Sequence, residues 1–377
     1  MLVITTIMEE KGCEEGKEGC DFGFETPGRG AIMGGMKDVM DVVRHWDEAE
    51  LASAEAVLVG VQHSSPRPPG ARLVVNEKGE AAGVVSMGCV ENDLREHLLG
   101  LLRGEGKPRI IHYGASFGPA LEVGLTCGGE IDVWIRRHDP ASAAWTGLCA
   151  LAPDARAVLL TRLDGDSEQA LLHPGDIPPV PDLQAALQAL WVRGGTRKIS
   201  TPDSAWFAEG ISPEPRLLIV GASPISMSLC ELASRTGFRV WIVDPRRDFA
   251  RAELFPAAEA VVHRWPEEGL AEAGLDAHSY VAVVAHDAKL DVPALAAALR
   301  AGARYIGLLG SPGTQADRRQ ALAAAGFPAE EIARIEGPIG LKAIGALEPA
   351  EIAVSILAEL IMVRRGVSPA NWKGNRP

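Results

Sequence analysis

Residues 217–226 read Leu217-Leu218-Ile219-Val220-Gly221-Ala222-Ser223-Pro224-Ile225-Ser226, an apolar strand-like run followed by a turn and the start of a helix. A strand, a turn that opens with glycine and a helix form the first unit of a Rossmann-like fold, in which the turn faces a phosphate-bearing ligand. Only the first glycine of the dinucleotide-binding fingerprint is present, because Ser223 and Ser226 occupy the other two glycine positions. We therefore predict a Rossmann-like fold and treat its choice of cofactor as a separate question.

Downstream of this turn, strand-like and helix-like segments alternate. Apolar strand-like runs occupy residues 217–220, 240–243, 260–262, 281–285 and 305–308, and helical patterns separate or follow them. This alternation is typical of a parallel sheet with crossover helices. The sequence therefore predicts a Rossmann-like parallel-sheet domain over residues 216–366.

Asp244 follows the second of these strands, 23 residues after Gly221. An acidic residue at this place commonly accepts a hydrogen bond from a ribose hydroxyl in dinucleotide-binding domains. The side chain of Ser223, however, would stand where a diphosphate approaches the backbone. An NAD(P)-dependent oxidoreductase is therefore the alternative function, and NAD(P) the second choice of cofactor.

Two further strand ends carry polar groups, namely His286-Asp287 and Gly310-Ser311. Ligands of open parallel sheets lie beyond the carboxyl ends of the strands, so we expect these turns and the Gly221 turn to contribute to one binding region. The alternative interpretation is structural, with His286 capping the next helix and the Gly310 turn being a tight turn followed by a helix cap.

The first part of the chain has a different pattern. Residues 36–197 combine helices with a predicted hairpin at 71–86 and several short strands, which indicates a mixed α/β domain. Residues 198–215 hold three prolines and show weak periodicity, so we predict a linker there. Residues 1–35 and 367–377 are predicted to be tails.

Two cysteines of this first domain lie in loops that suit ligand binding. Cys89 precedes a predicted helix, whose dipole would favour the thiolate, and Cys127 stands in a glycine-rich loop. Both thiols could instead be small buried apolar groups, or form a redox pair if they come within disulfide reach. No Cys-x-x-Cys pair supports a zinc site. Arg67 and Arg72, around a Pro/Gly loop, either bind an anion or solvate a turn.

The overall composition excludes several function classes. Hydrophobic residues make up 47% and charged residues 23% of the chain, which is a globular composition. The net charge of −13 disfavours binding to nucleic acid or to an anionic membrane. The sequence has no apolar run long enough for a membrane span, and its six cysteines are scattered. We therefore expect reduced thiols and a cytoplasmic location.

Eight runs of the sequence, taken in order, resemble the XdhC/CoxI family of accessory proteins for molybdenum hydroxylases. The runs are Ser65-Pro66-Arg67-Pro68-Pro69-Gly70-Ala71, Gly88-Cys89-Val90-Glu91, Cys127-Gly128-Gly129, Val243-Asp244-Pro245-Arg246, His286-Asp287-Ala288-Lys289-Leu290-Asp291, Tyr305-Ile306-Gly307-Leu308-Leu309-Gly310-Ser311, Gly337-Pro338-Ile339-Gly340-Leu341 and Pro349-Ala350-Glu351-Ile352-Ala353-Val354-Ser355. The resemblance covers residues 36–366. Within it, Ser223 and Pro224 stand where the family usually has Gly and His, and Met87 stands where it usually has Gly.

The resemblance implies a two-domain protein that binds molybdenum cofactor, favours its sulfurated form and delivers it to a xanthine-dehydrogenase-type molybdoenzyme, without being a hydroxylase itself. Molybdopterin carries a phosphate and a dithiolene, which suit a helix-end anion site and soft thiols. The candidate cofactor-binding residues are Arg67, Cys89, Cys127, Gly221, Ser223, Asp244, His286, Asp287, Gly310 and Ser311, of which Cys89 and Cys127 are candidate molybdenum ligands. We further expect a homo-oligomer and name a cysteine desulfurase as a second candidate partner.

Overall fold

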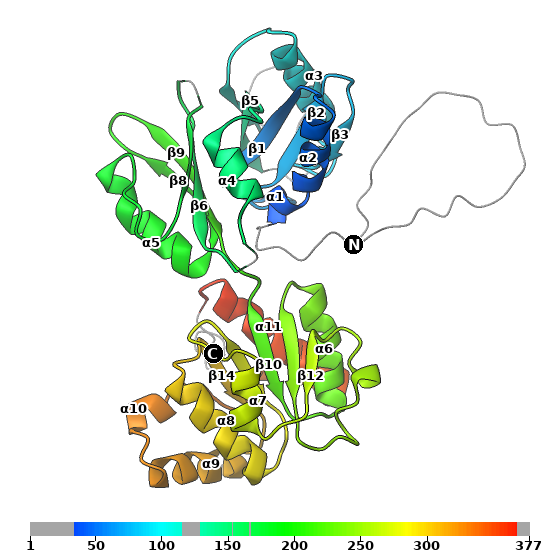
Figure 1. Cartoon of the computed structure of the whole chain (residues 1–377), viewed down its shortest axis with the longest axis vertical. Coiled ribbons are helices and arrows are strands. Elements are labelled where there is room, and N and C mark those ends of the chain that lie inside the picture. Colours follow the sequence, from blue (N-terminus) through cyan, green and yellow to red (C-terminus); the bar gives the residue numbers. More distant parts are fainter. Residues whose placement is uncertain (1–33, 115–128, 153, 166, 368–377) are drawn as a thin grey trace, which may run out of the picture. The chain divides into compact units, whose positions relative to one another are not determined.

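A computed structural model describes residues 34–114, 129–152, 154–165 and 167–367 of the chain (Figure 1). The chain divides between Pro213 and Glu214 into two compact units, here called the first and the second unit. Each unit has its own hydrophobic clusters, as expected for domains that bury separate cores.

The first unit contains an antiparallel five-stranded sheet with the order β3-β2-β1-β5-β4. Helix α3 packs on one face of this sheet, where Leu94, Leu98 and Leu101 join the strand side chains in an apolar cluster. The elements of this part are α1 (Gly34–Lys37), α2 (Met40–Glu48), β1 (Ser53–Gln62), β2 (Arg72–Asn76), β3 (Ala81–Gly83), α3 (Glu91–Leu102), β4 (Arg109–Tyr113) and β5 (Glu130–Arg137).

A second antiparallel sheet of the first unit has four strands in the order β7-β6-β9-β8. Its elements are α4 (Ala143–Cys149), β6 (Ala157–Arg162), β7 (Gln169–Leu172), η1 (Pro181–Leu183), α5 (Gln184–Arg193), β8 (Gly195–Ser200) and β9 (Ala205–Ile211). The mixed α/β prediction for this part of the chain is confirmed.

Strands β8 and β9 correct the prediction of a linker at residues 198–215. β9 is a buried strand between β6 and β8, so most of the predicted linker belongs to the fold of the first unit. The prediction was wrong because it took the three prolines as a sign of irregular structure, whereas none of them lies within a strand. Pro202 lies in the turn between β8 and β9, and Pro213 and Pro215 lie between β9 and the next strand, where a missing N–H costs no ladder bond.

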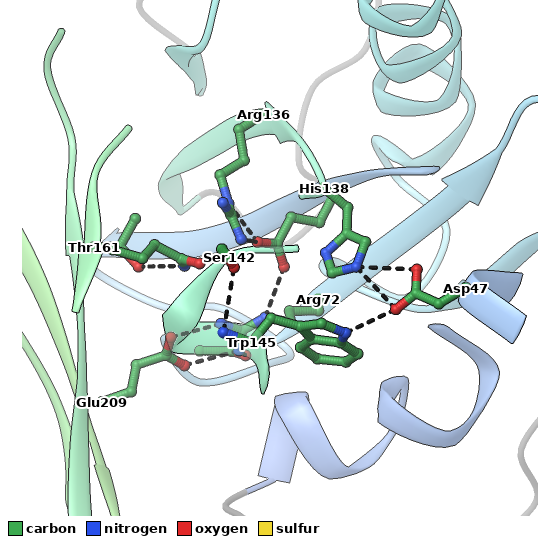
Figure 2. A network of polar contacts seen from close by, with 11 residues as sticks. Asp47, Arg72, Arg136, His138, Ser142, Trp145, Thr161 and Glu209 are labelled. Atoms are coloured by element: carbon green, nitrogen blue, oxygen red, sulfur yellow. Dashed lines mark hydrogen bonds and ion pairs between the residues drawn. The ribbon is translucent and has the colours of Figure 1, made fainter. Parts of the chain in front are cut away.

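A buried ion network joins the two sheets of the first unit (Figure 2). Arg72 of β2 is only 1% exposed and forms two hydrogen bonds, of 2.8 and 2.6 Å, to the carboxylate of Glu209 in β9. Glu55 of β1 accepts from both Arg72 and Arg136, at 3.1 and 2.6 Å. Such charges are stable in the interior only when they are paired and hydrogen-bonded, so the network links strands of both sheets. The prediction that Arg72 binds an anion or solvates a turn is therefore wrong.

The second unit contains a parallel six-stranded sheet with the order β12-β11-β10-β13-β14-β15. Helices α6 and α11 cover one face and pack on each other, and α7, α8 and α9 contribute to the apolar cluster of the other face. The chain crosses from β10 to β11 on one side and later returns to β13 on the other side of β10, which makes this a Rossmann-like arrangement with a switch point between β10 and β13. The fold class predicted for residues 216–366 is confirmed.

The elements of the second unit are β10 (Arg216–Val220), α6 (Pro224–Arg235), β11 (Arg239–Val243), η2 (Ala252–Leu254), β12 (Ala260–Val262), α7 (Pro266–Glu272), β13 (Tyr280–Val283), α8 (Ala288–Arg300), β14 (Tyr305–Leu308), α9 (Pro312–Ala324), α10 (Ala329–Ile332), β15 (Ile335–Glu336), η3 (Lys342–Ile344) and α11 (Pro349–Arg364). Among the helices that the structure describes, none combines the length and the apolar character that crossing a membrane requires.

Candidate functional site

The candidate residues of the second unit lie at one edge of the parallel sheet, where β10, β11, β13 and β14 end; we call it the carboxyl edge. Gly221 leaves β10 there with a φ of 105° and packs against the β13 turn. A Cβ atom at this position would lie 2.5 Å from the Cα of Ala285, so only glycine fits between the two turns. The switch point between β10 and β13 is therefore closely packed backbone.

Asp244 is fully buried, and both of its carboxylate oxygens are already bonded within the protein. Its Oδ2 accepts from the amide of Ala222 at 2.8 Å and from Nη2 of Arg246 at 2.7 Å, and its Oδ1 accepts from the amide and Nε of Arg246. Burial alone would raise the pKa of Asp244, but these hydrogen bonds outweigh it and lower the pKa. The ribose-binding role considered for Asp244 does not fit this arrangement, because both carboxylate oxygens already accept hydrogen bonds from Ala222 and Arg246.

Ser223 caps helix α6 and closes the turn that dinucleotides use. The Ser223 side chain accepts from the amide of Ser226, and the Ser226 hydroxyl accepts from the amide of Ser223 at 2.6 Å, which together form a capping box. Pro224 at the first helical position has no N–H at all. Amides that would bind a pyrophosphate are thus bonded to side chains, so this turn is a poor anion site.

The sequence left two roles open for His286, a helix cap and a contact to a ligand. Asp287, and not His286, caps helix α8, with its Oδ1 accepting from the amide of Lys289 at 3.0 Å. His286 has a φ of 57°, a conformation that residues other than glycine rarely adopt and that is enriched at functional sites. One turn later, the buried Asp291 pairs with Arg318 at 3.1 Å and so joins α8 to α9.

The turn after β14 has the contacts of a tight turn with a helix cap. Ser311 accepts from the amide of Thr314 at 3.3 Å and caps helix α9. Gly310 has a φ of 145°, and a Cβ atom there would meet the side chain of Thr314. Both residues lie at the carboxyl edge as expected, and these contacts are structural.

In the first unit, the candidate loops gather at one end of the five-stranded sheet. Gly129, just before β5, packs against the backbone of Ser64, where the loop of Arg67 begins. Tyr113 at the end of β4 donates to Asp93 in the first turn of α3 at 2.5 Å. The start of α3, which Cys89 precedes, therefore lies next to the end of β4. Cys127 lies outside the described residues.

The loop that carries Cys89 is organised by the carboxylate of Glu91. This carboxylate accepts from the hydroxyl of Ser86 at 2.7 Å and from the amides of Val85, Ser86, Gly88 and Val90. Burial would raise the pKa of Glu91, but the hydrogen bonds from Ser86 and the loop amides lower it and keep the group charged. Cys89 is half-buried, and its thiol stands one residue before the Val90 cap of α3, as predicted.

Arg67 is partly buried in its Pro/Gly loop. Its Nη2 pairs with Asp38 at 2.5 Å, while its buried Nε has no hydrogen-bond partner within the described residues. A buried donor without a partner is costly, so Arg67 retains capacity for an additional acceptor such as a phosphate oxygen.

Sequence reasoning missed a group of charged residues near the same end of the sheet. His112 of β4 and Lys198 of β8 contact the two oxygens of Asp132 in β5, at 2.5 and 2.8 Å. Burial would raise the pKa of Asp132, but the hydrogen bonds from Lys198 and His112 lower it. The sequence offered no signal, because Lys198 fell in the predicted linker. Among the described residues, no three His, Cys, Asp or Glu side chains form a cluster that could hold a metal ion.

A pocket of the first unit lies between α2, α4 and β1, and His138 and Trp145 are among its lining residues. Its open space has room for about one water molecule, so it does not accommodate a pterin cofactor. The buried hydroxyl of Ser53 lines it and has no partner within the described residues.

These features define a class of protein with two α/β units, of which the second is Rossmann-like but has a dinucleotide turn closed by its own side chains. Comparison with known proteins then identifies the family. Residues 217–360 match the family described as the XdhC Rossmann domain, and residues 46–114 match the XdhC and CoxI family.

Two relatives and one solved structure are similar over most of the chain. A protein from Bacillus subtilis, described as a probable xanthine dehydrogenase subunit, is 30% identical over 346 residues, covering 89% of this chain and 99% of the relative. A molybdenum cofactor insertion chaperone, PaoD, from Escherichia coli is 29% identical, covering 87% of this chain and 89% of its own. A crystal structure described as a xanthine dehydrogenase from Bacillus halodurans has 26% identity and a TM-score of 0.63, with 88% and 97% of the two chains covered. The chain belongs to the XdhC/CoxI family.

Proposed function

We propose that this protein binds the molybdenum cofactor, protects its sulfurated form and delivers it to a xanthine-dehydrogenase-type molybdoenzyme. The support that carries the proposal is the family itself, together with a relative described as a molybdenum cofactor insertion chaperone. The closed turn at Ser223 also supports the proposal. Nicotinamide-dependent enzymes bind a pyrophosphate at this turn, and here the capping box of Ser223 and Ser226 occupies its amides.

The donor groups of the protein fit the chemistry of this cofactor. Molybdenum and its sulfido ligand are soft, and Cys89 provides a half-buried thiol in a loop held by Glu91. The terminal phosphate requires cationic donors, and Arg67 retains an Nε that is unbonded within the described residues. When bound, the cofactor would supply the metal and sulfur chemistry, and these side chains would hold it and limit access of water. We propose Cys127 as a second thiol contact.

The proposal is tested with full-length protein purified without oxygen from a host that makes the cofactor. We would measure molybdenum and pterin per chain, and the activity that the loaded protein restores to a cofactor-free xanthine-dehydrogenase-type enzyme. Variants C89S and C127S should retain metal-bearing cofactor about ten-fold less well but metal-free pterin as the parent does, because only the soft contact is lost. R67A should weaken retention of both forms.

The matched control is C149S, since Cys149 is also half-buried but lies at the end of α4, bonded to Arg44. It should behave as the parent. The proposal is wrong if the parent carries neither molybdenum nor pterin and restores no activity. If the parent carries cofactor and restores activity, and C89S and C127S retain both forms of the cofactor as well as the parent does, then the two thiols contribute only to packing.

Three further parts of the proposal concern the location of the protein, its oligomeric state and a second partner. We propose that the protein works in the cytoplasm as a homo-oligomer, and that a cysteine desulfurase is a second partner that supplies sulfur to the bound cofactor. Co-purification of the desulfurase with the parent, dependent on the cofactor, would support this exchange. An NAD(P)-dependent oxidoreductase remains the alternative, and an unchanged melting temperature with saturating NAD(P) would count against it.

A further inference from the structure

An exposed aromatic ring lies beside a fixed guanidinium at the carboxyl edge of the second unit. Phe249, in the loop after β11, is 57% exposed, and Cζ of Arg246 lies 4.8 Å from the centre of its ring. Two hydrogen bonds from the guanidinium and one from the amide of Arg246 reach the buried Asp244 and hold Arg246 in place. The ring therefore stands on a rigid support, which lowers the entropy cost of stacking a ligand on it.

Asp287 places a carboxylate across β10 from this pair. It follows β13, while Arg246 follows β11, and β10 lies between those two strands. Neighbouring strands of a sheet lie about 4.8 Å apart, so β11 and β13 end about 10 Å from each other at the carboxyl edge. The hydrogen bonds to Asp244 are the main reason why the pKa of Arg246 is raised, and the charge of Asp287 adds to it. Only Oδ1 of Asp287 serves as the α8 cap, and a carboxylate has about four acceptor positions in all.

The closed turn at Ser223 determines which part of a ligand this edge can bind. A phosphate finds few available amides at the start of α6, and the carboxylate of Asp287 repels it. A flat heterocycle with neighbouring N–H donors is favoured instead, because its face stacks on an aromatic ring and its edge donates to a carboxylate.

We propose that Phe249, Arg246 and Asp287 form a binding site for a ring with a 2-amino-4-oxopyrimidine edge, which stacks on Phe249 and donates two N–H groups to Asp287. This inference rests on the proposed function, because the pterin of the molybdenum cofactor has this edge. Guanine nucleotides share the same edge, and the experiment separates the two sources.

The test measures binding of 6-hydroxymethylpterin, of GMP and of lumazine, which carries a carbonyl in place of the 2-amino group, to the full-length protein by calorimetry and fluorescence. The parent should bind the pterin at least ten-fold more tightly than lumazine, because a carbonyl cannot donate to Asp287. F249A should weaken pterin binding about ten-fold or more, and F249W should restore it, because any flat aromatic ring supports stacking.

D287N is the sharpest variant, because asparagine still caps a helix but replaces one acceptor oxygen by a donor. It should fold as the parent does and lose the preference for pterin over lumazine. D248N removes the same charge from the exposed residue next to Phe249 and should leave binding unchanged. Tighter binding of GMP than of the pterin, lost in D287N, supports the site and assigns it to a guanine nucleotide.

Equal binding of pterin and lumazine by the parent, or unchanged binding by F249A and D287N, overturns the inference. Restoration of the molybdoenzyme is measured on the same variants to keep the two claims apart. If F249A and D287N bind the pterin normally while the parent delivers cofactor, the ring site is wrong and the proposed function stands. If the parent binds the pterin through these residues but restores no enzyme, the site stands and delivery is wrong.

Discussion

Met87 occupies a backbone conformation that favours glycine. It has a φ of 68° in the loop before Cys89, and its side chain is 64% exposed, so little packing compensates for the strained conformation. The resemblance of the sequence to the family implies glycine at this position. The substitution in this chain therefore costs stability in a loop that bears a candidate ligand, and such strain is typical of functional sites.

Replacing Met87 by glycine should raise the free energy of unfolding of the first unit by about 0.5 to 1 kcal/mol, because glycine adopts this φ without steric cost. Urea denaturation followed by tryptophan fluorescence measures the change. M87A removes the same side chain but keeps the Cβ atom, so it should not stabilise. Equal stabilisation by both variants would show that the exposed side chain, and not the backbone, is responsible.

At the level of elements, helix α6 depends on the capping box that also closes its turn. S223A removes the side-chain acceptor of the Ser226 amide and should lower the free energy of unfolding of the second unit by about 1 kcal/mol. S228A, in the interior of the same helix, is the control and should be neutral or slightly stabilising, since alanine has the higher helix propensity. Equal losses in both would mean that the box contributes nothing.

At the level of the whole molecule, the buried ion network makes the first unit sensitive to acid. Burial alone would raise the pKa of Glu55, but the charges of Arg136 and Arg72 outweigh it and lower the pKa to about 2. A carboxyl whose pKa is lowered on folding stabilises the protein above its unfolded pKa and loses this contribution as the pH falls through the folded value. The contribution of Glu55 is therefore complete at neutral pH.

Stability of the first unit should accordingly fall between about pH 4.5 and pH 2, by on the order of 3 kcal/mol from Glu55. Urea unfolding at a series of pH values measures this loss. E55Q should be destabilised at pH 7, because Arg136 and Arg72 lose a partner, and should show a flatter pH dependence in this window. A pH dependence as steep as that of the parent would show that other carboxyls cause the acid loss.

The local pattern of the sequence was enough to predict the second unit and the position of its turns. Alternating strands and helices, with Gly221 after the first strand, depend on residues close together in the chain, and the parallel order follows from their connections. The same pattern placed His286, Asp287 and Ser311 at the ends of strands, which is where the structure has them.

What these side chains do depends on contacts between residues far apart in the chain, which local pattern does not contain. The carboxylate of Asp244 accepts a hydrogen bond from the amide of Ala222, 22 residues away. A residue in the ribose-binding position is therefore part of a closed turn. Arg72 and Glu209 are 137 residues apart, and their pairing shows that the predicted linker belongs to a sheet. The sequence by itself determined the fold class and the family. Tertiary packing alone decided which polar groups are bonded within the protein and which remain for a ligand, because burial and hydrogen-bond partners exist only in the folded chain.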